Sequence, residues 1–235
     1  MPAAWDDPRI ASGMKQQLSR RRALLRSGEP LGWKLAFGGP AALQRLRINE
    51  PLVGFLMTDA VLPSGSSVSL ANWKKPAAEP EIAVYMGKDL AAHADRKSVS
   101  EAIAGLGAAI ELADVDHPSE DVEGTLVRNI YQRHLVLSGC DSMHAGGSLA
   151  GLRGCVIRNG EELADTSDFE GLTGELIHIV GHVAALLSHF GETLRAGQLI
   201  IAGSITPPIW VAPGETIAFH LQPLEPISLS FTSAQ

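Results

Sequence analysis

The segment at residues 77–87, AAEPEIAVYMG, has the apolar character of a β-strand but carries two carboxylates, Glu79 and Glu81. Side chains two residues apart on a strand point to the same face of a sheet, so both charges share one face. Like charges repel each other, and burial of that face adds a desolvation cost of several kcal/mol for each ion. A fold that buries this strand must therefore bring a positive charge to it, whereas an edge strand leaves both glutamates in water.

Strand patterns dominate the rest of the chain and are not regularly interleaved with helices, which indicates a mixed α+β domain and not a doubly wound sheet. Amphipathic periodicity predicts helices over 8–27 and 173–190. Shorter helices are expected over 40–48, where proline begins the segment, and from a capping box at 98–101 through Leu106. Apolar patterns between turn residues predict strands over 31–37, 51–62, 80–87, 107–116, the end of 126–139, 198–206, 215–221 and 227–231, and a hairpin over 155–163 with Asn159-Gly160 at its turn.

Length and charge limit the possible functions. The 235 residues suit a single catalytic domain over 1–235, with 1–50 forming an N-terminal helical cap segment packed on it. A formal net charge of −7 argues against a nucleic-acid surface. We also expect no membrane partner, because no apolar run reaches the roughly 18 residues that a membrane helix needs. The N-terminus resembles no secretory signal, and Cys140 and Cys155 form neither a metal pattern nor a disulfide framework, so we expect a cytoplasmic protein.

A third carboxylate, Glu111, lies in the apolar strand predicted over 107–116. Glu79, Glu81 and Glu111 therefore occupy strands that could pair with or face each other. A hard divalent cation resolves their repulsion, because Mg²⁺ and Mn²⁺ bind oxygen ligands and keep positions open for water or substrate. The alternative is that Glu79 and Glu81 line the solvent face of an edge strand.

Two further segments carry polar groups in apolar surroundings. Lys34 lies in the middle of the predicted strand GWKLAF, where a lysine either extends its ammonium to water or is held near carboxylates. Gly203, Ser204 and Thr206 follow the apolar strand LIIA. Their hydroxyl and backbone N–H groups could hold a substrate carboxylate, or the segment is a plain turn.

The order of these motifs carries a resemblance. G-x-K, G-x-L-x-x-D, E-x-E, the glutamate of IELAD, a helix and L-x-x-G-Q-L-I-I-A-G-S follow one another from about Gly32 to Phe231. This order resembles the 2-keto-4-pentenoate hydratase and 4-oxalocrotonate decarboxylase family, which belongs to the fumarylacetoacetate hydrolase superfamily. The resemblance implies a mixed β-sandwich roll of the C-terminal-domain type with a small N-terminal helical segment, a Mg²⁺ or Mn²⁺ site, and a ring-like homo-oligomer.

The resemblance also implies roles for individual residues. The metal ligands fall on Glu79, Glu81 and Glu111, and the active-site lysine falls on Lys34. The substrate-contacting positions fall on Asp59, Asn129, Ser204 and Thr206.

The implied function is that of a metal-dependent lyase acting on a small 2-oxo acid or its dienol. The metal stabilises an enolate while Lys34 moves the proton. We expect hydration of a 2-hydroxypenta-2,4-dienoate-type substrate, with decarboxylation of a 4-oxalocrotonate-type substrate as the alternative. The resemblance also disfavours hydrolysis of a C–C bond, because the hydrolases of this superfamily typically carry a His–Glu pair before the E-x-E strand and a lysine after the third acid. Here the first histidine is His93, beyond Glu81, and no lysine follows Lys97.

The chain departs from the family pattern between residues 114 and 134. DVDHP replaces an Asp-Ser-Arg-like turn, and RNIYQ replaces an Asp-Asn-Ala-Ser-like run, of which only Asn129 matches. Arg128 and Tyr131 place a cation and a phenol where small polar residues are usual, which keeps open a third alternative, a non-catalytic metal-binding homologue.

Three histidines occur in the helix predicted over 173–190, namely His178, His182 and His189. We expect them on the side opposite the apolar stripe, exposed to solvent or to another subunit. The H-x-x-x-H spacing also suits zinc, but no third ligand or HExxH glutamate accompanies it.

Overall fold

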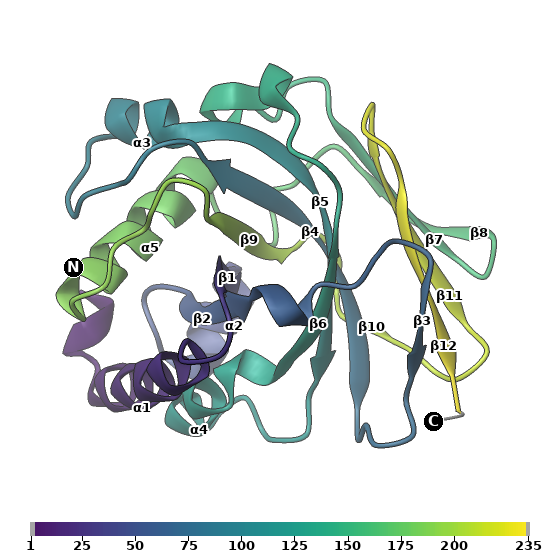
Figure 1. Ribbon diagram of the computed structural model, residues 1–235, viewed down its shortest axis with the longest axis horizontal. Coiled ribbons are helices and arrows are strands. Elements are labelled where there is room, and N and C mark those ends of the chain that lie inside the picture. Colours follow the sequence, from purple (N-terminus) through teal and green to yellow (C-terminus); the bar gives the residue numbers. More distant parts are fainter. Residues whose placement is uncertain (1–2, 234–235) are drawn as a thin grey trace.

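The strand that carries Glu79 and Glu81 lies inside the larger of two β-sheets in the computed structural model, which describes residues 3–233 (Figure 1). Within these residues the strands follow the order β2-β1-β9-β4-β5-β6, and β10 pairs with β4. Strands β1 and β9 run parallel, and the other neighbours run antiparallel. The bounds are β1 Pro30–Ala36, β2 Leu52–Met57, β4 Pro76–Met86, β5 Ile103–Asp114, β6 Gln132–Leu137, β9 Leu199–Ser204 and β10 Ile209–Trp210.

The smaller sheet has the order β3-β12-β11-β7-β8 and packs against β5, on the right in Figure 1. Along β11 the buried side chains of Ile217, Phe219 and Leu221 alternate with more exposed ones, as expected for a sheet with one face on the core. The two sheets confirm the expected α+β fold with a mixed β-sandwich roll. The bounds are β3 Ser66–Ser69, β7 Arg153–Arg158, β8 Glu161–Thr166, β11 Thr216–Gln222 and β12 Ile227–Thr232.

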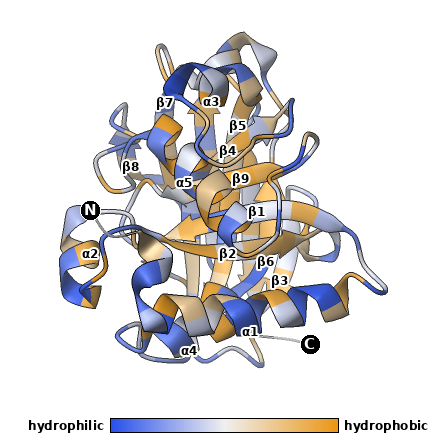
Figure 2. Ribbon diagram, turned by 90° about the vertical axis from the view of Figure 1, so that its left-hand side faces the viewer, coloured by the Kyte–Doolittle hydropathy of each residue, from blue (hydrophilic) through white to orange (hydrophobic). Residues whose placement is uncertain are grey.

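The predicted N-terminal helix is present as α1, and it packs side by side with α4 (Figure 2). It presents Ile10, Met14 and Leu18 to the core. None of the helices within residues 3–233 is long and apolar enough to cross a membrane. The helices are α1 Pro8–Leu24, α2 Pro40–Leu46, α3 Arg96–Ala102, α4 Val122–Val127 and α5 Leu176–His189, with short 3-10 turns η1 Ala4–Asp6, η2 Thr58–Ala60, η3 Asn129–Tyr131 and η4 Ser142–Gly147.

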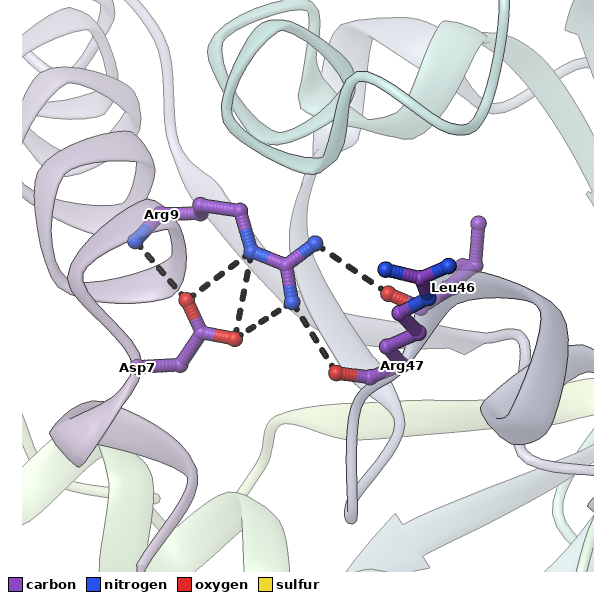
Figure 3. A network of polar contacts seen from close by, with 4 residues as sticks. All are labelled: Asp7, Arg9, Leu46 and Arg47. Atoms are coloured by element: carbon purple, nitrogen blue, oxygen red, sulfur yellow. Dashed lines mark hydrogen bonds and ion pairs between the residues drawn. The ribbon is translucent and has the colours of Figure 1, made fainter.

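Arg9 joins the start of α1 to the end of α2 (Figure 3). The Asp7 carboxylate caps α1 by accepting from the Arg9 backbone N–H at 2.9 Å, and it also pairs with the Arg9 guanidinium at 2.6 Å. The same guanidinium donates to the carbonyl oxygens of Leu46 at 3.2 Å and Arg47 at 3.0 Å. Both carbonyls belong to the last turn of α2, so one side chain fixes the two helices relative to each other.

The start and end of α3 differ from the prediction. Its N-cap is Asp95, whose carboxylate accepts from the Ser98 backbone N–H at 2.8 Å, so the predicted capping box at 98–101 was wrong. The helix ends at Ala102 and not at Leu106, because β5 already begins at Ile103 and pairs with β4 from there. Long-range strand pairing overrides the local helical pattern here.

Two histidines of α5, His178 and His189, are exposed as predicted, but His182 is not, which corrects the prediction for that residue. His182 is buried and contacts the Pro51 carbonyl oxygen at 3.0 Å. His178 pairs with Glu50 at 3.0 Å, and His189 stacks on Trp5 at 4.7 Å between ring centroids. Residues outside the core sheet cover α5 on its second side, so a stripe read from periodicity underestimates how much of the helix is buried.

Candidate metal centre

The pairing of β4 with β5 brings the three predicted metal ligands together. Its antiparallel register places Glu79 directly opposite Glu111, and Glu81 shares the face of Glu79. One carboxylate oxygen of each lies within 4.8 Å of the others. Since β4 lies between β9 and β5 and Glu81 is 1% exposed, the alternative of a solvent-facing edge strand was wrong.

Lys34 supplies a positive charge to this cluster from β1. Its side chain is 1% exposed, and its ammonium donates to Glu111 Oε1 and, at 3.2 Å, to the Ile130 carbonyl oxygen. The second oxygen of Glu111, Oε2, is buried and has no hydrogen-bond partner among the described residues. A buried acceptor without a partner is costly, and a bound cation would satisfy it.

A backbone group orients the second glutamate. The N–H of Gly203 donates to Glu81 Oε2 at 2.7 Å. Gly203 has φ +96°, a conformation that glycine adopts without the penalty of a Cβ, so the sequence Ala-Gly-Ser can turn this N–H toward the cluster at the end of β9.

Burial and mutual repulsion make these carboxylates hard to ionise. Burial, with the negative charge of Glu111 as a second cause, raises the pKa of Glu79 to about 7. Burial also raises the pKa of Glu81 and of Glu111, although the Lys34 ammonium opposes the rise for both. Three carboxylates against one ammonium leave two negative charges when all are ionised, and this surplus fits an oxygen-binding divalent cation such as Mg²⁺ or Mn²⁺.

A cavity of about 510 Å³ opens beside the cluster and is lined by Lys34, Glu79 and Glu81. Ser204 and Thr206, the two hydroxyl residues predicted to contact substrate, also line it. The Thr206 hydroxyl donates to the Pro207 carbonyl at 3.0 Å, whereas the Ser204 bond to the Pro80 carbonyl is 3.4 Å, long for a hydroxyl donor. The Ser204 hydroxyl is therefore the more available of the two for a ligand.

Two predicted substrate contacts lie elsewhere. Asp59 is exposed in η2 and does not line the cavity. Asn129 is buried outside the lining, where its amide accepts from the Phe55 N–H at 2.8 Å and donates to the Phe55 carbonyl at 2.9 Å. Asn129 thus continues the hydrogen bonding of β2, and neither residue belongs to the lining of this cavity.

The divergent stretch RNIYQ shapes the site through its backbone. Asn129, Ile130 and Tyr131 have φ values of 53°, 50° and 65°, three successive non-glycine residues in the left-handed region. That conformation costs about 1–2 kcal/mol per residue and persists only where the surroundings enforce it. It directs the Ile130 carbonyl to Lys34, while Tyr131 lines the cavity.

The sequence analysis missed several residues of the cavity wall, among them Lys75, Arg45, Leu172 and Trp210. One signal was available for Lys75, because its odd number places it on the same face of the β4 segment as Glu79 and Glu81. No local pattern marks the others, since helix α2, strand β10 and the loop at Leu172 reach the cavity through tertiary contacts.

A second group of possible metal ligands lies on the β7–β8 hairpin. One atom each from Cys155, Glu162 and Asp165 lies within 4.8 Å of the others. Asp165 is already paired with Arg153 at 2.8 Å, and none of the three residues lines the 510 Å³ cavity.

Comparison with known proteins agrees with this geometry. A 2-keto-4-pentenoate hydratase from Paraburkholderia xenovorans (strain LB400) is 24% identical over 223 residues, which cover 94% of this chain and 82% of the relative. A 4-oxalocrotonate decarboxylase from Pseudomonas putida is 27% identical over 222 residues, which cover 90% of this chain and 81% of the relative. These relatives confirm the resemblance inferred from the order of motifs.

Solved structures show the same fold. A 4-oxalocrotonate decarboxylase from Pseudomonas putida G7, complexed with magnesium and adipate, superposes with a TM-score of 0.85 at 25% identity and covers 94% of this chain and 86% of its own. A fumarylpyruvate hydrolase from Pseudomonas aeruginosa, with Mn²⁺ and pyruvate, shares the fold at 16% identity and a TM-score of 0.67, covering 88% of this chain and 91% of its own. The sequence model of the fumarylacetoacetate (FAA) hydrolase C-terminal family matches residues 39–228, and the chain therefore belongs to that family.

Proposed function

We propose that this protein is a metal-dependent lyase acting on a small 2-oxo acid or its dienol. One observation carries the proposal: three glutamates converge beside Lys34, two of them, Glu79 and Glu81, line a cavity of about 510 Å³, and one buried oxygen of Glu111 has no partner among residues 3–233. Relatives named as hydratase and decarboxylase, and a similar structure that contains magnesium, support this function.

Glu79, Glu81 and Glu111 would hold Mg²⁺ or Mn²⁺ through their carboxylate oxygens. When bound, the ion supplies Lewis-acid stabilisation of negative charge on the 2-oxygen of the substrate. The Gly203 N–H keeps the Glu81 carboxylate in place, since it donates at 2.7 Å to one oxygen of a carboxylate that is otherwise repelled by its neighbours.

Lys34 is the proposed proton carrier. It lines the cavity, and its two acceptors, Glu111 Oε1 and the Ile130 carbonyl, fix the position of its ammonium. A group held in this way can deliver and recover a proton along the carbon chain of a substrate bound beside it. Ser204 and Thr206 are the proposed hydroxyl contacts for the carboxylate of that substrate.

Hydration of a 2-hydroxypenta-2,4-dienoate-type substrate is the first candidate reaction, and the hydratase relative supports it. Decarboxylation of a 4-oxalocrotonate-type substrate is the second, because the structure that superposes with a TM-score of 0.85 is a decarboxylase complexed with a dicarboxylate, adipate. Both reactions pass through the same enolate, so Lys34 and the three glutamates serve either one.

The test is turnover of 2-hydroxypenta-2,4-dienoate and of 2-oxohex-3-enedioate by the purified protein with Mg²⁺ or Mn²⁺. We expect metal-dependent turnover of at least one of them, and loss of that turnover in Glu111→Gln. Metal binding without turnover of either compound would instead support the non-catalytic metal-binding homologue. Absence of metal binding would overturn the proposal as a whole.

We also propose that the protein is a homo-oligomer. The side chains of Leu163 and Trp210 are 48% and 43% exposed, and both border a second cavity of about 440 Å³. Apolar surface of this kind favours contact with another chain. Light scattering at micromolar concentration tests the proposal, and a monomeric mass would contradict it.

A further inference from the structure

Lys75 lines the same cavity as Glu79 and Glu81 and lies just before the first residue of β4. The β4–β5 ladder continues through it, because the Val115 N–H donates to the Lys75 carbonyl at 3.0 Å. Residues 75, 77, 79 and 81 therefore share one face, and Lys75 is about 13 Å along the strand from Glu79 at roughly 3.3 Å per residue. The cavity is thus lined by the carboxylates of Glu79 and Glu81 in the middle of β4 and by the Lys75 ammonium at the start of that strand.

The wall between these two places is apolar. Ala77 lies between Lys75 and Glu79, and its partners across the sheet are Ala113 on β5 and Trp210 on β10. Partners in register point to the same face, and both Ala113 and Trp210 line the cavity.

Lys75 is the cation of this lining that has no carboxylate partner within 4.0 Å among residues 3–233. Its ammonium lies 4.2 Å from the centroid of the Trp210 ring. Of the other two cations, Lys34 is paired with Glu111, and Arg45 lies 3.7 Å from Glu120.

The neighbouring acid, Asp114, is fully used by other groups. One of its oxygens accepts from the backbone N–H groups of Lys74 and Lys75, at 2.9 and 2.8 Å. Its other oxygen pairs with Arg133 at 3.1 Å. The Lys75 ammonium is therefore available to an anion that enters the cavity.

We propose that Lys75 binds the distal carboxylate of a dicarboxylic 2-oxo acid, whose 2-oxo acid end is held at the glutamate cluster. This inference rests on the proposed function and, of its two candidate substrates, favours the 4-oxalocrotonate type, because that chain is charged at both ends, whereas 2-hydroxypenta-2,4-dienoate carries a single carboxylate. Lys75 is then a residue that determines specificity and takes no part in the proton transfer.

Two unreactive ligands isolate this contact. 2-Oxoadipate and 2-oxohexanoate have the same chain length and the same 2-oxo acid end, but one ends in a carboxylate and the other in a methyl group. Calorimetric titration of the Mg²⁺-loaded protein should show roughly tenfold tighter binding of 2-oxoadipate, the effect of one charge-assisted hydrogen bond. Lys75→Met should abolish the difference and leave the affinity for 2-oxohexanoate unchanged, and Lys75→Arg should restore it.

Lys74→Met is the matched control. Lys74 is the preceding residue, pairs with Asp116 at 3.6 Å and does not line the cavity, so this variant should keep the full preference for 2-oxoadipate. Thermal unfolding of each variant and titration with Mg²⁺ alone establish that fold and metal site are intact.

Equal affinity of the unaltered protein for both ligands would overturn the inference and leave the proposed function standing. A preference that survives Lys75→Met would also overturn it. If Lys75→Met lowers the affinity for both ligands equally, Lys75 contacts the 2-oxo acid end that they share, and this result would also overturn the inference. Failure of both ligands to bind the Mg²⁺-loaded protein would overturn the proposed function, and this inference with it.

Discussion

Two groups of residues satisfy the same distance criterion for a metal site. One is the carboxylate cluster of the larger sheet, and the other is Cys155, Glu162 and Asp165 on the β7–β8 hairpin. Each brings three ligand atoms within 4.8 Å. They differ in burial and in charge balance. Glu81 and Glu111 are buried, with Lys34 as their cation, whereas Glu162 and Asp165 are exposed, and Asp165 is paired with Arg153.

This difference shows that unbalanced charge under burial marks a metal site better than the proximity of ligands does. On the hairpin, water and salt screen the carboxylates, and Arg153 neutralises one of them. In the larger sheet screening is weak, because Glu81 and Glu111 are almost fully buried, and one ammonium is left to balance three carboxylates. Only the second arrangement gains substantially from a divalent ion.

The largest expected effect is on metal binding itself. Glu111→Gln keeps the shape of the side chain but removes a charge and an anionic ligand, so affinity for Mg²⁺ or Mn²⁺ should fall at least about 100-fold. Glu162→Gln on the hairpin is the matched control and should leave the affinity unchanged. Calorimetric titration measures both, and loss of binding in Glu162→Gln but not in Glu111→Gln would reverse the comparison.

The next effect concerns the cation of the buried cluster. Lys34→Met should lower kcat by roughly 10²–10⁴-fold, the usual contribution of a general acid–base group, while metal binding is largely kept. Lys74→Met, an exposed lysine whose removal leaves the cluster intact, serves as control. A Lys34→Met enzyme with unchanged kcat would show that the Lys34 ammonium serves only to balance the charge of Glu111 and takes no part in the proton transfer.

The third prediction concerns pH. Because burial raises the pKa of Glu79 from its usual 4.5 to about 7, the folded protein holds a proton there that the unfolded chain releases. The contribution of this group to stability is therefore complete below about pH 4.5 and is lost as pH rises through about 7. The free energy of unfolding of the metal-free protein should decrease from pH 4.5 to about pH 7. In Glu79→Gln the free energy of unfolding should depend less on pH over this range.

Mg²⁺ reverses this trend, since the ion and the proton compete for the same oxygens. The affinity of the protein for Mg²⁺ should rise roughly tenfold per pH unit, up to about pH 7, for each proton that the ion displaces. Titrations between pH 5.5 and 8 check the slope, and an affinity independent of pH would contradict the raised pKa.

The smallest effect is expected on the hairpin. Arg153→Met removes the cation that pairs with Asp165, but the freed carboxylate lies in water. The free energy of unfolding should change by less than about 1 kcal/mol, the usual range for an exposed ion pair. The stoichiometry should stay at one divalent ion per chain. A second ion in this variant would show that charge balance alone, without burial, creates a metal site.

Much of the buried cluster could be predicted from the sequence because strand periodicity is local. The spacing of Glu79 and Glu81 fixes their common face, and Glu111 and Lys34 stand out as charges in apolar strands. The register that sets Glu79 opposite Glu111 could not be predicted, since it depends on pairing between segments about 30 residues apart.

Predictions failed where tertiary contacts override a local pattern. Asn129 matches a family position but its amide is occupied by the backbone of Phe55. His182 is buried because the segment at Pro51 covers a side of α5 that periodicity leaves polar. The cap of α3 is Asp95 and not the box at 98–101, since several serines and acids compete for one helix start.

The Arg9 contacts have a practical consequence for anyone who shortens or tags this chain. The Arg9 guanidinium donates hydrogen bonds to the carbonyls of Leu46 and Arg47 at the end of α2. The same helix contributes Pro40, Ala42 and Arg45 to the cavity wall. The first turn of α1 thus holds one wall of the cavity in place from outside it. Of the residues that the structure describes, 3–9 include none that lines the cavity, yet their removal would loosen that wall and weaken ligand binding before it affects the metal.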